Sequence, residues 1–182
     1  MNETLTTIKN RYSCRSYTGE AVCREALEAI SLAAVQSPSA MNQQPWEIIV
    51  LTNKALIDEM DSAVMDMLSQ QNDKALYTRM KDRGGKIFYN APCMFIIAQK
   101  PDTDIDCGIV CENIALAASS LGLGNVICKL AGLAFNTIKG NEYKKKLIPD
   151  GYEFGVAVLV GHAASSQATP HQVNMSKIKY ID

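Results

Sequence analysis

Four short runs of apolar residues, rich in β-branched side chains, punctuate this chain of 182 residues. They occupy residues 46–52, 94–98, 125–128 and 154–161. The first two lack the alternation of polar and apolar residues that marks a half-exposed strand, so both faces of these strands should be covered. Covering both faces requires helices on either side of a single sheet. The runs therefore predict an α+β fold with three layers, α/β/α.

Helical spacing of apolar residues predicts the segments between these strands. The predicted helices are residues 3–11 with Asn2 as the cap, a helix opening at Thr18 or Gly19 and continuing to Pro38, and helices over 54–71, 105–121 and about 135–147. The segment 105–121 is rich in alanine and apolar nearly all round. Such a helix belongs in the interior, or between two subunits where a small protein has little interior to spare.

The region 70–86 is polar and charged, and Gly84 and Gly85 lie near its end. It fits a solvated surface helix and turn. The alternative is a mobile flap that meets an anionic dinucleotide, because glycine permits motion and the basic side chains favour phosphate.

The length and the hydrophobic content of 47% suit one domain over residues 1–182. The net charge of -1 argues against nucleic acid as a partner, because binding to its backbone needs a concentrated basic surface. The first 20 residues lack the apolar core of a signal peptide, and no apolar run approaches a membrane span. We therefore expect a cytoplasmic protein without a membrane partner.

None of the six cysteines forms a Cys-x-x-Cys pair, so zinc-ribbon and iron–sulfur motifs lack their spacing and we predict no metal site. Cys107 and Cys111 are four residues apart on a predicted helix, and their role stays open between small apolar packing groups and a redox pair. His162 and His171 have no second ligand-type histidine near them in the sequence. Hydrolytic triads and zinc enzymes are not supported.

A loop from Ser37 to Trp46 places two side-chain amides between prolines, just before the first apolar strand. Asn42 and Gln44 each offer a carbonyl acceptor and an NH₂ donor, which suits the alternating edge of a flat heterocycle such as a flavin pyrimidine ring. The same residue types also form plain turns for backbone reasons.

A second cluster, residues 11–17, contains two guanidinium groups and several hydroxyls close to a short N-terminal helix. Arginine presents a planar fork of donors that matches phosphate oxygens, and serine adds a compact donor. Taken alone, the cluster also fits a solvated basic helix end.

Together these motifs resemble the FMN-dependent nitroreductase family. The resemblance covers nearly the whole chain and rests on several short motifs in order. They are Arg11-x-Ser13-x-Arg15, Ser37-Pro38-Ser39, Asn42-x-Gln44-Pro45-Trp46, Asn90-Ala91-Pro92, Asp106-Cys107-Gly108 through Glu112-Asn113, Leu121-Gly122-Leu123-Gly124, and Phe154-Gly155 through Gly161-His162.

The resemblance implies a central mixed, mainly antiparallel sheet flanked by helices. It also implies a homodimer with exchanged terminal segments and two FMN sites at the interface. NADH or NADPH would be the electron donor, and a small electron-poor molecule would be the acceptor.

The resemblance also assigns roles to residues. Arg11 and Ser13 would hold the FMN phosphate beside the backbone of Tyr12, and Arg15 would lie toward the N1 and C2 carbonyl region of the ring. Asn42 and Gln44 would address the pyrimidine edge. The remaining residues that the resemblance assigns to the flavin are Pro38, Ser39 and Ala40, from the other subunit, and Ile127, Cys128, Lys129 and Leu130, near N5 of the ring.

The implied reaction is ping-pong hydride transfer through the flavin N5, so no catalytic protein residue is assigned and the protein holds and tunes the flavin. Nitroaromatics, quinones and activated enones are the implied acceptors. Two alternatives remain open: a same-fold enzyme with dehalogenating or flavin-cleaving chemistry, and a flavin-binding protein without turnover.

The chain departs from the family pattern at two places. Many relatives carry Glu-Gly or Gly-Gly where this chain has Lys129 and Leu130. Many also carry a basic residue after the final strand that completes the phosphate site, where this chain has His171, with Lys177 and Lys179 further on.

Overall fold

The computed structural model describes residues 2–165 and 172–181. Its helices are α1 (Glu3–Asn10), α2 (Arg24–Val35), α3 (Lys54–Gln70), α4 (Ala75–Asp82), α5 (Asp104–Ser120) and α6 (Gly140–Leu147), with short 3₁₀ helices η1 (Ala40–Asn42), η2 (Lys129–Asn136) and η3 (Met175–Lys177). Its strands are β1 (Trp46–Leu51), β2 (Cys93–Gln99), β3 (Gly124–Cys128) and β4 (Glu153–Gly161). All four predicted strands are confirmed.

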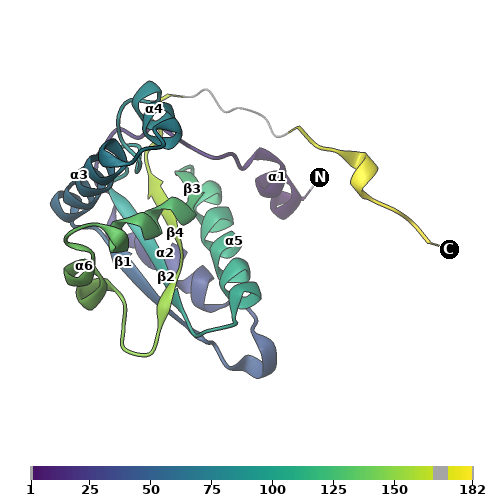
Figure 1. The fold of residues 1–182 in the computed structure, drawn as a ribbon. Coiled ribbons are helices and arrows are strands. Elements are labelled where there is room, and N and C mark those ends of the chain that lie inside the picture. Colours follow the sequence, from purple (N-terminus) through teal and green to yellow (C-terminus); the bar gives the residue numbers. More distant parts are fainter. Residues whose placement is uncertain (1, 166–171, 182) are drawn as a thin grey trace.

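The strands form one sheet in the order β1-β2-β4-β3, and all three pairings are antiparallel (Figure 1). An isolated parallel bridge between Ser13 and Asn125 extends the sheet beyond β3. This arrangement confirms the mixed, mainly antiparallel sheet, and it leaves β1 and β3 as the edge strands.

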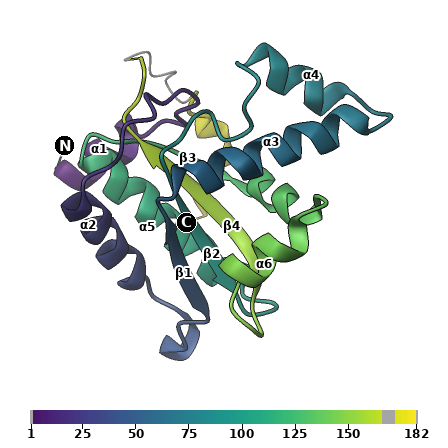
Figure 2. The same cartoon turned by 90° about the vertical axis from the view of Figure 1, so that its left-hand side faces the viewer.

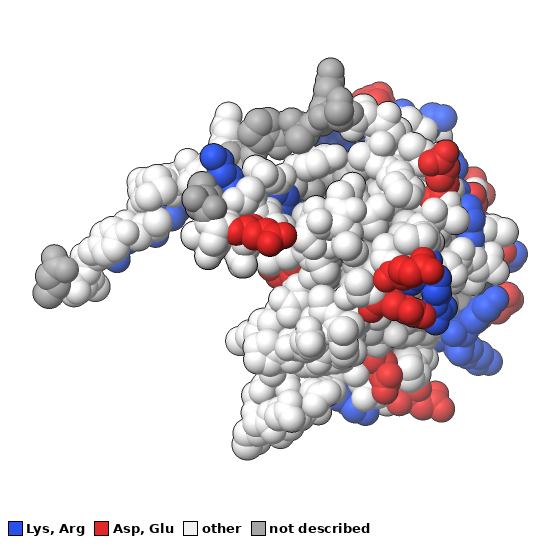
Figure 3. Space-filling view, turned by 180° about the vertical axis from the view of Figure 1, so that it is seen from behind, with Lys and Arg blue, Asp and Glu red and all other residues white. Residues whose placement is uncertain are grey.

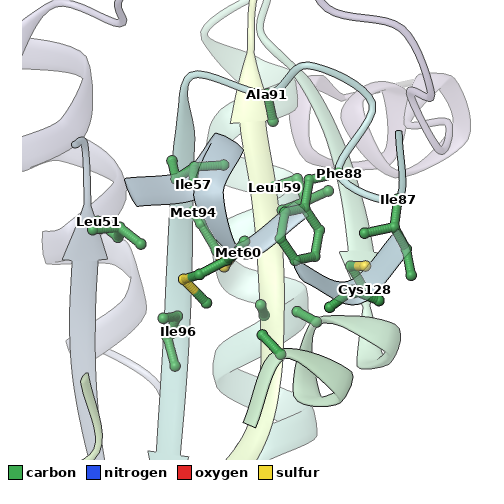
Figure 4. Close-up of a cluster of buried hydrophobic side chains, with 14 of the residues drawn as sticks. Leu51, Ile57, Met60, Ile87, Phe88, Ala91, Met94, Ile96, Cys128 and Leu159 are labelled. Atoms are coloured by element: carbon green, nitrogen blue, oxygen red, sulfur yellow. The ribbon is translucent and has the colours of Figure 1, made fainter. Parts of the chain in front are cut away.

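Helices cover both faces of the sheet, as the apolar strands required (Figure 2). One face packs against α2 and α5, whose Ile30 and Ile114 are fully buried with Phe95 of β2. The other face packs against α3, η2 and α6. Figure 4 shows the core of that second layer, where Met60 lies with Met94 and Leu159. Burying each side chain of this size contributes about 1.5–3 kcal/mol, so the two layers hold the sheet rigidly between them.

Three predictions about the elements were wrong in detail. The second helix starts at Arg24, not at Thr18 or Gly19, because Thr18 instead donates its N–H to the His162 carbonyl (3.0 Å) and Gly19 has a φ of +86°. The strand at 46–52 is an edge strand, and Glu47 on it is exposed, so its faces are only partly covered.

The helix predicted at 135–147 is divided into η2 and α6. The break covers residues 137–139, and at Gly140, the first residue of α6, a Cβ would lie 2.2 Å from the Phe135 carbonyl oxygen. Only glycine allows the chain to fold back so closely. The helices predicted at 3–11, 54–71 and 105–121 are confirmed within one residue at each end, and the Asn2 side chain caps α1 by accepting from Leu5 N–H (3.0 Å).

No helix within the described residues is long and apolar enough to cross a membrane. The described C-terminal residues, 172–181, form an extended tail that points away from the body (Figure 1). Its Val173, Met175, Tyr180 and Ile181 side chains are all exposed.

Candidate functional site

The segment 11–17 follows α1 and pairs with the edge strand β3 at Ser13. Helix α1 ends at Asn10, and Cys14 N–H then donates to the Asn125 carbonyl (2.8 Å). Gly124 makes this approach possible, because a Cβ there would lie 2.7 Å from the Cys14 sulfur. Strand pairing therefore fixes Ser13 beside β3, with Arg15 two residues further along.

The end of this segment is pinned by Tyr17. Its N–H donates to the Tyr89 carbonyl (3.2 Å), and its buried hydroxyl donates to the Leu159 carbonyl (3.2 Å). Burial, with the nearby Cys14, raises the pKa of Tyr17, so the hydroxyl stays protonated. The segment is thus held from both ends, and its polar side chains gain a fixed position.

A cavity of about 350 Å³ lies beside this segment. Its lining consists of Tyr12, Ser13, Cys14, Arg15, Ser16, Arg83 and Ser165. Two guanidinium groups and several hydroxyls in one cavity suit an anion with several oxygens, and phosphate above all. The residues present therefore fit the phosphate-bearing cofactor that the sequence predicted.

Arg11 lies just outside that lining, against α5. Its Nε is 3.9 Å from Glu112 Oε1, and its side chain is largely buried whereas the Glu112 side chain is half exposed. Arg15 is exposed, and its Nη1 donates to the Ser13 carbonyl at 3.4 Å. The cluster is therefore not the freely solvated helix end that its composition alone allowed.

The predicted ring contacts at 127–130 lie at the C-terminal end of β3. Ile127 leaves 42% of its surface exposed on this edge strand, and it does not line the cavity beside Arg15. Cys128 is buried, and burial raises the pKa of its thiol to about 11. The Lys129 ammonium group donates to the Gly155 carbonyl, and Leu130 is partly buried. Of the four, only Ile127 therefore offers a large apolar side chain to a ligand outside the sheet.

The loop from Ser37 to Trp46 has a strained backbone. Met41, Asn42 and Gln44 have φ values of 50°, 54° and 46°. Non-glycine residues in this region are strained by about 1–3 kcal/mol each, and such strain clusters at binding sites. All three side chains are exposed, so the core does not demand this conformation.

Local hydrogen bonds hold the loop in shape. Gln44 N–H donates to Ser39 Oγ (2.8 Å), and the Gln44 amide donates to Asn42 Oδ1 (3.1 Å). Ala40 N–H donates to Asp106 in the first turn of α5 (3.2 Å). The two predicted amides are therefore adjacent, and their outer donors and acceptors face solvent.

The structure does not bring this loop and the arginine cluster into one cavity. None of the predicted loop residues, Pro38 through Gln44, lines the cavity beside Arg15. The loop precedes β1, at the opposite edge of the sheet from β3, as Figures 1 and 2 show. One chain thus carries two separate parts of the predicted site.

The resemblance assigned no role to four residues of the cavity lining, which are Cys14, Ser16, Arg83 and Ser165. The sequence feature that could have identified Arg83 is its position as a basic residue directly before two glycines, Gly84 and Gly85. Lys177 and Lys179 lie exposed in the C-terminal tail, and His171 lies outside the described residues.

The four buried cysteines outside the segment 11–17 behave as packing groups. Burial raises the pKa of Cys107 to about 11 and of Cys111 to about 12. Their thiols are therefore protonated at neutral pH, which makes them poor nucleophiles.

The model of the Nitroreductase family matches residues 8–135 of this chain. A crystal structure described as a nitroreductase with bound FMN, from Desulfitobacterium hafniense DCB-2, is 44% identical and superposes with a TM-score of 0.95 over 100% of both chains.

Two curated relatives are more distant. An Archaeoglobus fulgidus protein with the provisional name NADH dehydrogenase/NAD(P)H nitroreductase is 30% identical over 69% of this chain and 67% of its own length. A Bacillus subtilis protein named FMN reductase [NAD(P)H] is 27% identical over 92% of this chain and 69% of its own length. The chain spans about two thirds of the length of both relatives.

Proposed function

Since the chain belongs to the nitroreductase family and is a flavin oxidoreductase, we propose that it is an FMN-dependent NAD(P)H oxidoreductase that reduces an electron-poor acceptor in a ping-pong reaction. The observation that carries the proposal is the cavity in which Ser13, Arg15 and Arg83 converge beside an edge strand. When bound, FMN would accept hydride from the nicotinamide donor and pass the electrons to a nitroaromatic, quinone or enone.

The chain's own residues then have binding and positioning roles. Ser13 supplies a hydroxyl donor for the phosphate, with Tyr12 backbone beside it, and Arg11 supplies positive charge from the α5 side. The resemblance pointed Arg15 toward the ring, but Arg15 lines the same cavity as Ser13 and Arg83, so we assign its positive charge to the phosphate. Ile127 offers an apolar surface for a flat ring.

The loop residues complete the site from a second copy of the chain. The physical reason is that the loop and the cavity are separate within one chain, while Asn42 and Gln44 keep outward-facing amides. An apolar surface is available for such pairing: Leu5 and Ile8 of α1 and Ile105 of α5 are about half exposed or more. In Figure 3, charged side chains gather on the right of the view, and fewer lie on the left.

A visible spectrum and a donor assay test the cofactor and the reaction together. Purified protein should show flavin absorbance, and NADH or NADPH should bleach it without oxygen. Replacing both Arg11 and Arg15 with alanine should strip the flavin, because charge-assisted hydrogen bonds are worth about 1.5–3 kcal/mol each.

The matched control is Arg24→Ala with Arg79→Ala, which removes two exposed arginines away from the cavity. Full flavin content in the Arg11/Arg15 variant contradicts the cofactor assignment. Tight FMN binding with no bleaching by either donor instead supports a flavin-binding protein without turnover.

The dimer is tested by charge insertion. Leu5→Asp with Ile8→Asp should convert a dimer to a monomer in light scattering and lower the flavin content at the same time. Ile138→Asp is the control, since this fully exposed residue lies between η2 and α6. A monomeric wild-type protein that binds FMN fully would refute the shared site.

A further inference from the structure

Among the described residues, Arg83 is the one lining residue of the cavity that comes from the end of helix α4. The other lining residues come from the segment 12–16 and from Ser165 after β4, whereas Arg83 is the C-cap of α4. Arg15 and Arg83 are therefore far apart in the sequence but line the same cavity of about 350 Å³. Two like charges at one cavity repel, so their placement favours an anion between them.

The attachment of α4 to the body is weak. Met80 is the only residue of this eight-residue helix that is buried. Leu76 and Tyr77 are partly buried, and the remaining side chains of the helix are exposed. An element with so few apolar contacts opens at low free-energy cost.

The chain immediately after Arg83 is suited to bending. Gly84 and Gly85 have φ values of +99° and +74°, and a Cβ on either would meet no atom within 4 Å. Their N–H groups donate to the Lys81 and Met80 carbonyls (3.1 and 2.9 Å), so the two glycines end α4, and their backbone conformation is one that only glycine adopts readily.

The chain beyond the two glycines is, by contrast, firmly anchored. The buried Asp61 carboxylate accepts from the N–H groups of Ile87 and Phe88, both at 3.0 Å. Lys86 donates to Asp58 (3.3 Å) and to Asn90 Oδ1 (3.2 Å). A weakly held helix, two unpacked glycines and a fixed anchor together form a hinge.

We propose that α4 is a lid hinged at Gly84 and Gly85, and that Arg83 closes it by binding a phosphate group together with Arg15. The proposal rests on the function proposed above and deepens it. The phosphate belongs either to FMN or to the nicotinamide donor, since both present the same chemistry to a guanidinium group.

Binding titrations and kinetics distinguish the two sources, with Arg83→Gln as the variant and Arg79→Gln as the control. Arg79 is exposed on the same helix and does not line the cavity. If the FMN phosphate is the ligand, Arg83→Gln should bind FMN at least about tenfold more weakly, with riboflavin affinity unchanged. If the donor is the ligand, KM for NADH or NADPH should rise by a similar factor while FMN affinity is kept.

Limited trypsin digestion reports on the lid without any turnover. Cleavage after Arg83 in the wild-type protein should slow when the phosphate-bearing ligand is added, and riboflavin should give no such protection. Arg83→Lys should recover part of the lost affinity, since it keeps the charge without the planar fork.

The inference is overturned if Arg83→Gln matches Arg79→Gln in FMN affinity and in KM for both donors. Equal trypsin cleavage with and without ligand also overturns it. Wild-type protein that binds no FMN instead refutes the proposed function, and this inference with it.

Discussion

The buried carboxylate of Asp61 offers a quantitative test of how the site is supported. Only 3% of this residue is exposed, and its two oxygens accept from the N–H groups of Ile87 and Phe88. These hydrogen bonds fix the anchor of the proposed lid, and Tyr89, which follows, accepts from Tyr17 N–H. Asp61→Ala therefore leaves two backbone donors without partners next to the core.

The magnitude follows from those two donors. Each buried donor left unpaired costs about 1–3 kcal/mol, which gives about 2–6 kcal/mol in total. Burial raises the pKa of Asp61 despite the two hydrogen bonds, so the carboxylate itself carries a desolvation cost that the variant no longer bears. We therefore expect a net loss of about 2–4 kcal/mol in the free energy of unfolding, a large share of a typical domain's 5–15 kcal/mol.

Urea unfolding of flavin-free protein measures this loss, with the single, buried Trp46 as a fluorescent probe. Asp61→Asn keeps one acceptor and should lose less than Asp61→Ala. Asp58→Ala is the control: its half-exposed carboxylate pairs with Lys54 and Lys86, and such surface pairs are worth about 0–1 kcal/mol. A loss below about 1 kcal/mol for Asp61→Ala would refute the reasoning.

Three further predictions concern the buried thiols and a packed glycine. In native protein at pH 8, only the exposed Cys23 should react quickly with Ellman's reagent, and all six cysteines should react after unfolding; several fast thiols in the native protein would contradict this. Burial raises the pKa of Cys107 and Cys128 from 9.0 to about 11, so the folded state holds these thiol protons more tightly than the unfolded state. The resulting contribution to the free energy of unfolding is complete below pH 9 and should be lost as the pH rises toward 11. The urea midpoint should therefore fall between pH 8 and pH 10.5, and Cys107→Ala should reduce that fall; an unchanged midpoint argues against the buried thiols. Gly155→Ala places a Cβ 2.6 Å from the Cys107 sulfur and 2.9 Å from the Ile97 carbonyl oxygen, so it should cost about 1–3 kcal/mol by thermal unfolding, with partial recovery on adding Cys107→Ala. A Tm equal to that of the wild type would count against this packing.

The strands were the most predictable elements. Cys93–Gln99 is buried at every position, so its apolar run carried an unmistakable signal. The sequence did not predict that β1 lies at the edge of the sheet, because its apolar run resembles that of β2 although Glu47 faces solvent. Which strand lies at the edge depends on pairing, and pairing is a property of the whole chain.

The predicted helix boundaries were wrong where tertiary contacts overrode the local spacing of apolar residues. Residues 18–22 have helical periodicity, yet strand-like bonds of Tyr17 and Thr18 to distant parts of the chain hold this stretch extended. At Gly140 the chain folds back on Phe135, and the local sequence pattern does not predict this contact.

The sequence by itself determined the kinds of side chain available to a cofactor: two arginines with a serine near the N-terminus, and two amides in a Pro-bracketed loop. These are chemical facts that need no coordinates. Only the tertiary structure decided their arrangement. The sheet order places the arginine cluster beside β3 and the loop before β1, the strand at the other edge, and the C-terminal end of α4 places Arg83 in the cavity beside Arg15. The physical reason is that composition and spacing fix what each segment can bind, whereas strand pairing and packing fix which segments meet.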